Sequence, residues 1–148
     1  MKEDDSRRGC EIFTLSAYET SAREFFGELR RRQADLLLDI RLRNTSQLCG
    51  FTKEKDLGYL VSALTGARYL HDLRFAPSPE LLQAYQKKQL DFEGYRQGYA
   101  QEMAERQSCA YFWKQYGGYA HICLLGTATR KRRSHSEVLL ELLQRENG

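Results

Sequence analysis

Three side chains in the sequence are suited to acid–base chemistry: Asp39, His71 and His135. Asp39 directly follows a run of three leucines, and His71 ends a second, shorter run of strand-forming residues. His135 precedes a segment with the apolar spacing of a helix. A carboxylate or an imidazole in a concave site is a common general acid or base. These three residues are therefore the candidate catalytic residues.

Two arginines, Arg41 and Arg43, follow Asp39 at intervals of two residues. Residues two apart on a strand share a face, so one acid and two guanidinium groups would lie together. Guanidinium donors fit a phosphate or a carboxylate bidentately, which makes both arginines candidate ligand-binding residues. The alternative is an internal Asp39–Arg41 ion pair that holds the following loop. Further candidate ligand-binding side chains near the same strand ends are Ser46 and Tyr69.

A basic loop precedes the last predicted helix. Residues 130–133 are four consecutive cations, and no acidic residue lies between Gly126 and His135. Because the N-terminus of a helix offers N–H donors and the positive end of the helix dipole, this segment is suited to bind a phosphate. It lacks the spacing of a Walker loop, and a solvated basic loop is the alternative. The candidate ligand-binding residues of this segment are Thr127, Arg130, Arg133 and Ser134.

Alternating strands and helices must position these candidates. Strand-forming segments cover residues 11–15, 34–41, 67–71 and 119–125, with helical apolar spacing between them. The leucine-rich second segment is typical of a strand buried on both faces, as in a parallel sheet. The predicted fold class is α/β: a single Rossmann-like domain with a mostly parallel sheet of about four strands flanked by helices. Such sheets bind ligands beyond the carboxyl ends of their strands, where the candidate residues gather.

Local signals mark the ends of several helices. Ser21 with Glu24, and Ser134 with Glu137, have the spacing of a capping box. The aromatic run at residues 111–116 precedes two glycines and is predicted to be a packed connection. These signals indicate where helices start or stop, and leave open where each helix packs.

Composition limits the class of protein. The 148 residues include 23 Lys or Arg and 20 Asp or Glu, a formal charge of +3, which excludes a histone-like or tail-type nucleic-acid binder. No apolar run is long enough to cross a membrane. Residues 1–9 are expected to be a flexible charged leader rather than an export signal, and residues 10–148 a single domain. The four cysteines form no Cys-x-x-Cys pair, so we expect no metal, no cofactor and reduced thiols in the cytoplasm.

The sequence resembles a bacterial and archaeal family known as domain of unknown function 488, over roughly residues 11–143. The matching motifs are an Asp-x-Arg strand end, a loop serine, a Gly-Phe-x-Lys segment and a Tyr-x-His strand. In this sequence they are Asp39, Arg41, Ser46, Gly50, Phe51, Lys53, Tyr69 and His71. The resemblance implies a Rossmann-like α/β fold and no established reaction, and it adds Lys53 to the candidate ligand-binding residues.

The last motif of this sequence departs from the family pattern. Members commonly end the last strand with Cys-x-Glu and open the last helix with Cys-His-Arg. The corresponding positions here are Gly126, Ala128, Ser134, His135 and Ser136, so only the histidine remains. The resemblance is therefore to a divergent member of the family, and an activity that depends on those cysteines or on the glutamate is not expected.

Three functions are compatible with these residues. The first is recognition of a phosphate-bearing ligand, a nucleotide or a nucleic acid, at the carboxyl edge of the sheet. The second is a hydrolase or transferase that acts on a nucleoside or phosphorylated substrate, with Asp39 and His71 as acid–base groups. The third is a degenerate, noncatalytic interaction module that uses exposed aromatics at residues 111–116, which a large exposed apolar patch would favour. The oligomeric state stays open.

Overall fold

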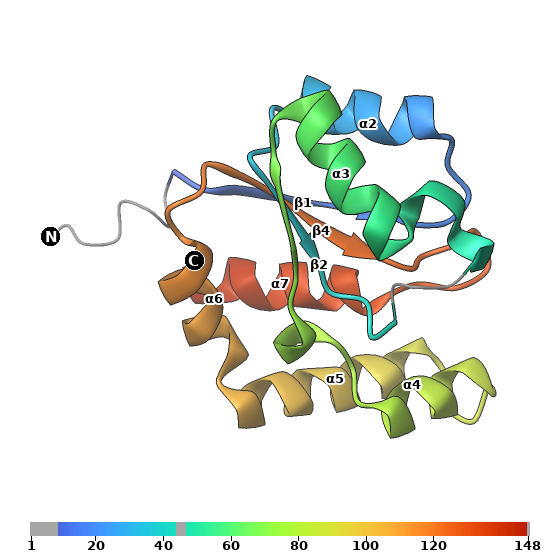
Figure 1. Cartoon of the computed structure of the whole chain (residues 1–148). Helices are drawn as coiled ribbons and strands as arrows, with labels where there is room; N and C mark the ends of the chain where they lie inside the picture. The colour runs from blue at the N-terminus through green and yellow to red at the C-terminus, as the bar shows by residue number, and fades with distance from the viewer. Residues whose placement is uncertain (1–8, 44–46, 148) are drawn as a thin grey trace, which may run out of the picture.

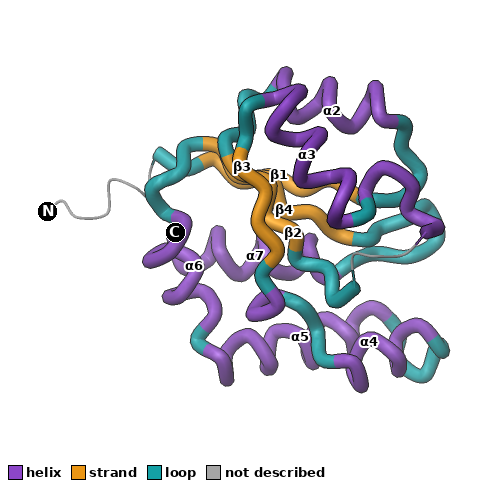
Figure 2. The backbone as a smooth tube through the Cα atoms, in the orientation of Figure 1, coloured by secondary structure: helices purple, strands orange, loops and turns teal. Residues whose placement is uncertain are grey.

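A parallel sheet forms the centre of the molecule (Figure 2). The computed structural model describes residues 9–43 and 47–147. Its four strands all run parallel in the order β1-β4-β2-β3. They are β1 (Glu11–Ser16), β2 (Leu36–Asp39), β3 (Arg68–His71) and β4 (His121–Gly126). The predicted α/β class and parallel sheet are confirmed, whereas the predictions for Ser46 and for residues 1–8 of the leader lie outside the described residues.

Helices cover both faces of the sheet (Figure 1). On one face lie α2 (Ala22–Arg31) and α3 (Glu54–Thr65). On the other lie α4 (Pro79–Gln86), α5 (Phe92–Arg106), α6 (Ser108–Tyr116) and α7 (His135–Asn147). Short 3-10 helices occupy Gln47–Thr52 and Leu73–Phe75. Within the described part of the chain, no helix is long and apolar enough to span a membrane.

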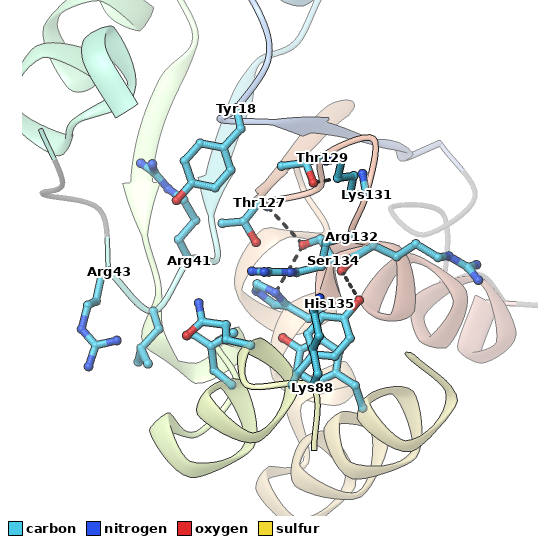
Figure 3. Close-up of a pocket in the computed structure, with 16 residues that line it drawn as sticks. Tyr18, Arg41, Arg43, Lys88, Thr127, Thr129, Lys131, Arg132, Ser134 and His135 are labelled. Carbon is cyan, nitrogen blue, oxygen red and sulfur yellow. Dashed lines mark hydrogen bonds between the residues drawn. The ribbon is translucent and has the colours of Figure 1, made fainter. Parts of the chain in front are cut away.

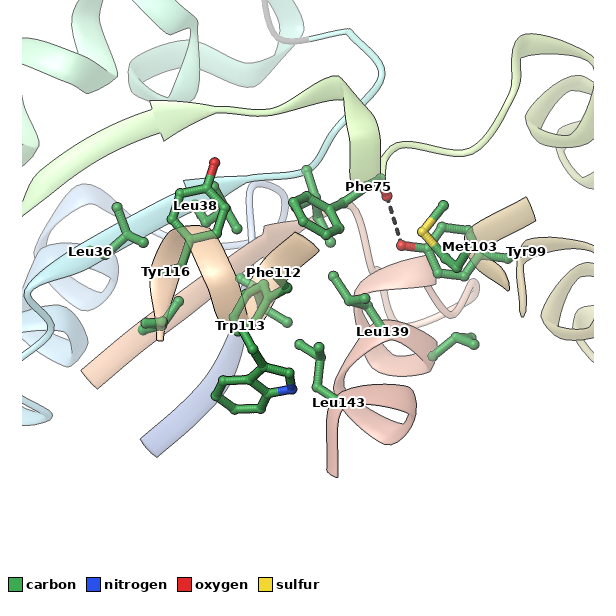
Figure 4. Close-up of a cluster of buried hydrophobic side chains, with 14 residues drawn as sticks. Leu36, Leu38, Phe75, Tyr99, Met103, Phe112, Trp113, Tyr116, Leu139 and Leu143 are labelled. Carbon is green, nitrogen blue, oxygen red and sulfur yellow. Dashed lines mark hydrogen bonds between the residues drawn. The ribbon is translucent and has the colours of Figure 1, made fainter. Parts of the chain in front are cut away.

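Strand β2 is buried on both faces, as its consecutive leucines predicted. Leu36 and Leu38 pack in a cluster that contains Phe112 of α6 and Leu139 of α7 (Figure 4). Leu37 lies in the opposite cluster, which includes side chains of α2 and α3. Because successive residues of a strand point to opposite faces, one leucine run supplies both cores.

Strand β2 ends two residues earlier than predicted. Ile40 still donates its N–H to the Leu125 carbonyl (3.2 Å), but the Arg41 N–H donates to Oδ1 of Asp39 at 3.2 Å. The chain therefore leaves the sheet after Ile40, while the side chains of Asp39 and Arg41 still lie together, as their spacing predicts, with Nη2 of the arginine 2.8 Å from Oδ2 of the aspartate.

The aromatic run at residues 111–116 is part of α6, so the predicted packed connection is wrong in its secondary structure. Phe112, Trp113 and Tyr116 are buried, and Phe112 and Tyr116 pack ring to ring with centroids 5.6 Å apart. The segment is helical because these three side chains are buried together along one face of α6. The aromatic content of the sequence alone does not reveal this face. The same burial overturns the idea that these aromatics form an exposed partner surface.

One of the two predicted capping boxes forms. Ser21 Oγ accepts from the Glu24 N–H at 3.1 Å, and the Glu24 carboxylate accepts from the Ser21 N–H. At α7, Ser134 Oγ accepts from the Ser136 N–H at 3.3 Å, while the Glu137 carboxylate pairs with Arg133. Because the Glu137 carboxylate pairs with Arg133, it does not complete the second predicted capping box.

Candidate anion-binding site

A cavity of about 510 Å³ lies at the carboxyl edge of the sheet (Figure 3). Four segments far apart in sequence form its wall: the loop after β1, the chain after β2, helix α4 with Lys88 two residues beyond it, and the connection from β4 to α7. Tyr95 of α5 adds to this wall. The sixteen lining residues are Tyr18, Arg41, Leu42, Arg43, Leu82, Tyr85, Gln86, Lys88, Tyr95, Thr127, Thr129, Lys131, Arg132, Arg133, Ser134 and His135.

Helix α4 reaches this cavity because it packs closely on α5. A Cβ atom at Gly98 of α5 would lie 2.7 Å from Cδ1 of Leu81, so the glycine permits the close approach. The ring of Tyr85 stacks on that of Tyr95 with centroids 4.1 Å apart. The Tyr85 hydroxyl donates to the Arg133 carbonyl at 2.9 Å, which ties α4 to the connection from β4 to α7. These contacts place Lys88, just beyond α4, at the cavity.

The lining carries a marked excess of positive charge. Its six Lys and Arg residues are Arg41, Arg43, Lys88, Lys131, Arg132 and Arg133, and none of the sixteen lining residues is Asp or Glu. Two of the six have carboxylate partners just outside the lining: Asp39 for Arg41 and Glu137 for Arg133. The side chains of the other four make no ion pair with a described residue. Like charges gathered in one concavity produce a positive potential that favours an anionic ligand.

Asp39 and Arg41 form a buried ion pair at the cavity wall, in which Arg41 is a lining residue and Asp39 lies behind it. Their exposed fractions are 0% and 1%. Arg41 donates from Nε to Asp39 Oδ1 at 2.9 Å and from Nη2 to Oδ2 at 2.8 Å. The Tyr69 hydroxyl also donates to Oδ2 at 2.5 Å, and Arg41 Nη2 donates to the Thr52 carbonyl at 2.6 Å. The internal pair weighed above as the alternative is thus present, and both carboxylate oxygens of Asp39 already accept hydrogen bonds.

The two predicted catalytic histidines hold the chain that follows β2 from opposite sides. His71 Nε2 lies 2.7 Å from the Arg41 carbonyl, and His135 Nε2 lies 2.7 Å from the Ile40 carbonyl. Each Nε2 is a donor in these contacts, because a carbonyl only accepts. Burial lowers the pKa of His135 from 6.5 to about 4, so this imidazole is neutral at pH 7. His135 lines the cavity, whereas His71 does not.

Backbone donors at the start of α7 are largely used inside the protein. Ser134 Oγ accepts from the Thr127 N–H at 3.1 Å and from the Ser136 N–H at 3.3 Å. Ser134, His135 and Ser136 are all buried. The Glu137 N–H donates to the Ser134 carbonyl at 3.2 Å, so two of the first backbone donors of α7 already have partners inside the protein. The cationic side chains are the donors that face the cavity instead.

The structure brings together part of the predicted site. The predicted residues that line the cavity are Arg41, Arg43, Thr127, Arg133, Ser134 and His135. Lys53 caps the start of α3, with its amine 3.9 Å from the Asp56 carboxylate. Arg130 is exposed and outside the lining, and its backbone N–H donates to Glu19. Tyr69 and His71 lie on β3, at the edge of the sheet and outside the cavity lining: Tyr69 donates to Asp39 at the end of β2, and His71 contacts the Arg41 carbonyl.

The prediction missed the contribution of α4. Leu82, Tyr85, Gln86 and Lys88 all line the cavity, and no residue of this segment was a candidate. The available signal was the pair Lys87-Lys88 at the end of a helix whose start, Ser78-Pro79, is a clear cap. That signal gives the helix its bounds, but its position at the carboxyl edge follows only from packing on α5.

Among the described residues, no group of three or more His, Cys, Asp or Glu side chains is placed to hold a metal ion.

Comparison with curated proteins and with solved structures found no match. A family model does match, over residues 21–143, and this range holds the central Asp39–Arg41 pair as well as the connection from β4 to α7. The chain belongs to the family described as domain of unknown function DUF488.

Proposed function

We propose that this protein binds a phosphate-bearing ligand, a nucleotide or a nucleic acid, in the cavity at the carboxyl edge of its sheet. One observation carries the proposal: Arg43, Lys88, Lys131 and Arg132 line the cavity without an ion pair to any described residue, and none of the sixteen described lining residues is Asp or Glu. Ammonium and guanidinium groups that have no carboxylate partner can donate charge-assisted hydrogen bonds to phosphate oxygens.

Binding is favoured over catalysis by the state of the candidate acid–base groups. Asp39 is buried with both oxygens engaged, and His71 lies outside the cavity. His135 lines it, but its lowered pKa and its hydrogen bond to Ile40 make it a poor proton donor at neutral pH. A hydrolase or transferase that uses Asp39 and His71 would need the segment after β2 to move.

The test compares two neighbouring arginines. Arg132 lines the cavity and Arg130 does not, although both are exposed and belong to the same short hairpin, closed by hydrogen bonds between Thr129 and Arg132. Calorimetry with nucleotides and short oligonucleotides at low salt should show that Arg132→Ala weakens binding about tenfold, the scale of one charged hydrogen bond. Arg130→Ala should bind like the parent.

Equal losses in the two variants would mean that general positive charge, rather than the cavity, attracts the ligand. Absence of binding by the parent to every phosphate compound would refute the proposal.

We also propose that the protein is located in the cytoplasm, because the described cysteines Cys10, Cys109 and Cys123 are all free thiols.

A further inference from the structure

The four cations of the cavity come from three separate segments. Arg43 follows β2, Lys88 follows α4, and Lys131 and Arg132 belong to the hairpin between β4 and α7. Figure 3 shows Arg43 on one side of the cavity, Lys131 and Arg132 on the other, and Lys88 at the bottom of the view. A single phosphoryl group is too small to reach cations placed on several sides of a cavity of about 510 Å³.

The charge of the four cations also indicates a ligand with more than one phosphoryl group. A phosphate monoester carries a charge of about −1.5 to −2 at neutral pH. One such group would leave about half of the four cations without a counter-charge. Each linked phosphoryl group adds at least one ionised oxygen, so two linked groups would neutralise most of the four cations and three would neutralise about all of them. Their oxygens would extend across the cavity toward each segment.

The absence of carboxylates from the sixteen lining residues bears on the metal that usually accompanies such ligands. Proteins that bind magnesium complexes of di- and triphosphates generally hold the metal through one or two carboxylates together with the phosphates. The described lining of this cavity contains six lysines and arginines and no such carboxylate. Its cations can supply the positive charge that a metal would otherwise bring to the phosphates.

We infer that the ligand of this cavity is a compact phosphate ester with two or more linked phosphoryl groups, a nucleoside di- or triphosphate being an example, and that it binds without Mg²⁺. This inference rests on the proposed function and narrows it. A nucleic acid is the less favoured ligand, because its phosphates are spread along a strand whereas these cations converge on one concavity.

Calorimetry with two series of compounds tests the inference: phosphate, pyrophosphate and tripolyphosphate, and then AMP, ADP and ATP, all at low salt with EDTA. Each added phosphoryl group should tighten binding about tenfold, because it adds charge-assisted hydrogen bonds. Excess Mg²⁺ should weaken ATP binding, since it neutralises the charge that the cavity recognises. An oligonucleotide of the same total charge as ATP should bind more weakly than ATP.

Variants show whether the gain in affinity with each added phosphoryl group depends on the cations of this cavity. The double substitution Arg43→Gln/Lys88→Gln removes cations from two of the three segments and should abolish most of the tenfold steps. Lys87→Gln is the matched control for Lys88, because Lys87 is also exposed and lies one residue away outside the lining. Thermal unfolding of each variant checks that the fold is kept.

The possible failures can be told apart. Equal affinity for AMP and ATP would overturn this inference and leave the proposed function standing. Tighter ATP binding with Mg²⁺, or an oligonucleotide that outbinds ATP, would also overturn it. If no phosphate compound binds, both proposals fall together.

Discussion

Two regions at the carboxyl edge of the sheet use arginine in opposite ways. Beyond β2, Arg41 is 1% exposed and is held by Asp39 and the Thr52 carbonyl. Beyond β4, Arg132 is exposed and has no ion pair with a described residue. The first arginine is part of the internal structure, and the second is available to a ligand. The comparison teaches that a guanidinium near a strand end indicates a binding site only when its own carboxylate partner is missing.

The largest expected effect comes from breaking the buried pair. Arg41→Gln would leave the Asp39 carboxylate buried without its counter-charge, and we expect a loss of about 3–5 kcal/mol in the free energy of unfolding. Arg43→Gln, two residues away and exposed, is the matched control and should leave stability within about 0.5 kcal/mol of the parent. Urea unfolding of both variants measures the difference. Similar small losses in both would show that the Asp39–Arg41 pair is not the structural element we describe.

The next effect concerns pH and the histidine between the two regions. Above pH 6.5 the His135 imidazole is neutral in the folded and the unfolded chain, so it adds no pH dependence. Below pH 6.5 the unfolded chain takes up a proton that the folded protein refuses until about pH 4. Stability should therefore fall across this window, by about 3 kcal/mol from this group alone.

His135→Gln isolates that contribution, because glutamine keeps an N–H donor for the Ile40 carbonyl and does not titrate. Denaturant unfolding at several pH values should give a shallower loss below pH 6.5 for the variant than for the parent. Parallel pH profiles for the two proteins would contradict the buried, neutral state of this histidine.

A smaller effect is expected at the end of β4. A Cβ atom at Gly126 would lie 2.7 Å from Ser134 Oγ and closer still to Ser136 Oγ. Gly126→Ala should cost about 1–3 kcal/mol of unfolding free energy by overpacking, and adding Ser136→Gly should restore part of it. Gly27→Ala is the control, since its Cβ would meet nothing within 4 Å and alanine favours the helix. Chemical denaturation of the three variants and the parent measures these differences, and equal effects at both glycines would count against the tight packing.

The smallest expected effect concerns the exposed Arg133–Glu137 ion pair in the region beyond β4. Glu137→Gln removes the carboxylate that pairs with Arg133 at the cavity wall, which gives the cavity a fifth uncompensated cation. Stability should hardly change, because the pair is exposed, whereas affinity for ATP should rise about twofold. The gain should shrink as salt is added. Calorimetry at two salt concentrations measures it, and unchanged or weaker binding would separate Arg133 from the ligand.

Much of the fold could be predicted from the sequence. The apolar spacing of residues predicts the alternation of strands and helices, and the leucine run in β2 predicts a strand buried on both faces. Caps such as Ser21 and Ser78 fix where helices begin, since their hydrogen bonds join residues two or three positions apart. These features are local, so a single chain segment contains the information for each.

Only the tertiary structure decides which charged side chains are buried in ion pairs and which line the cavity. Asp39 and Arg41 are close in sequence, but their burial depends on Thr52 and Tyr69 from two other segments. Lys88 lines the cavity because α4 packs on α5, and Ser134 Oγ accepts both the Ser136 N–H at the start of α7 and the Thr127 N–H just after β4. The chain thus determines its strands, helices and caps segment by segment, whereas the site depends on burial and on partners brought from distant segments, which local spacing does not encode.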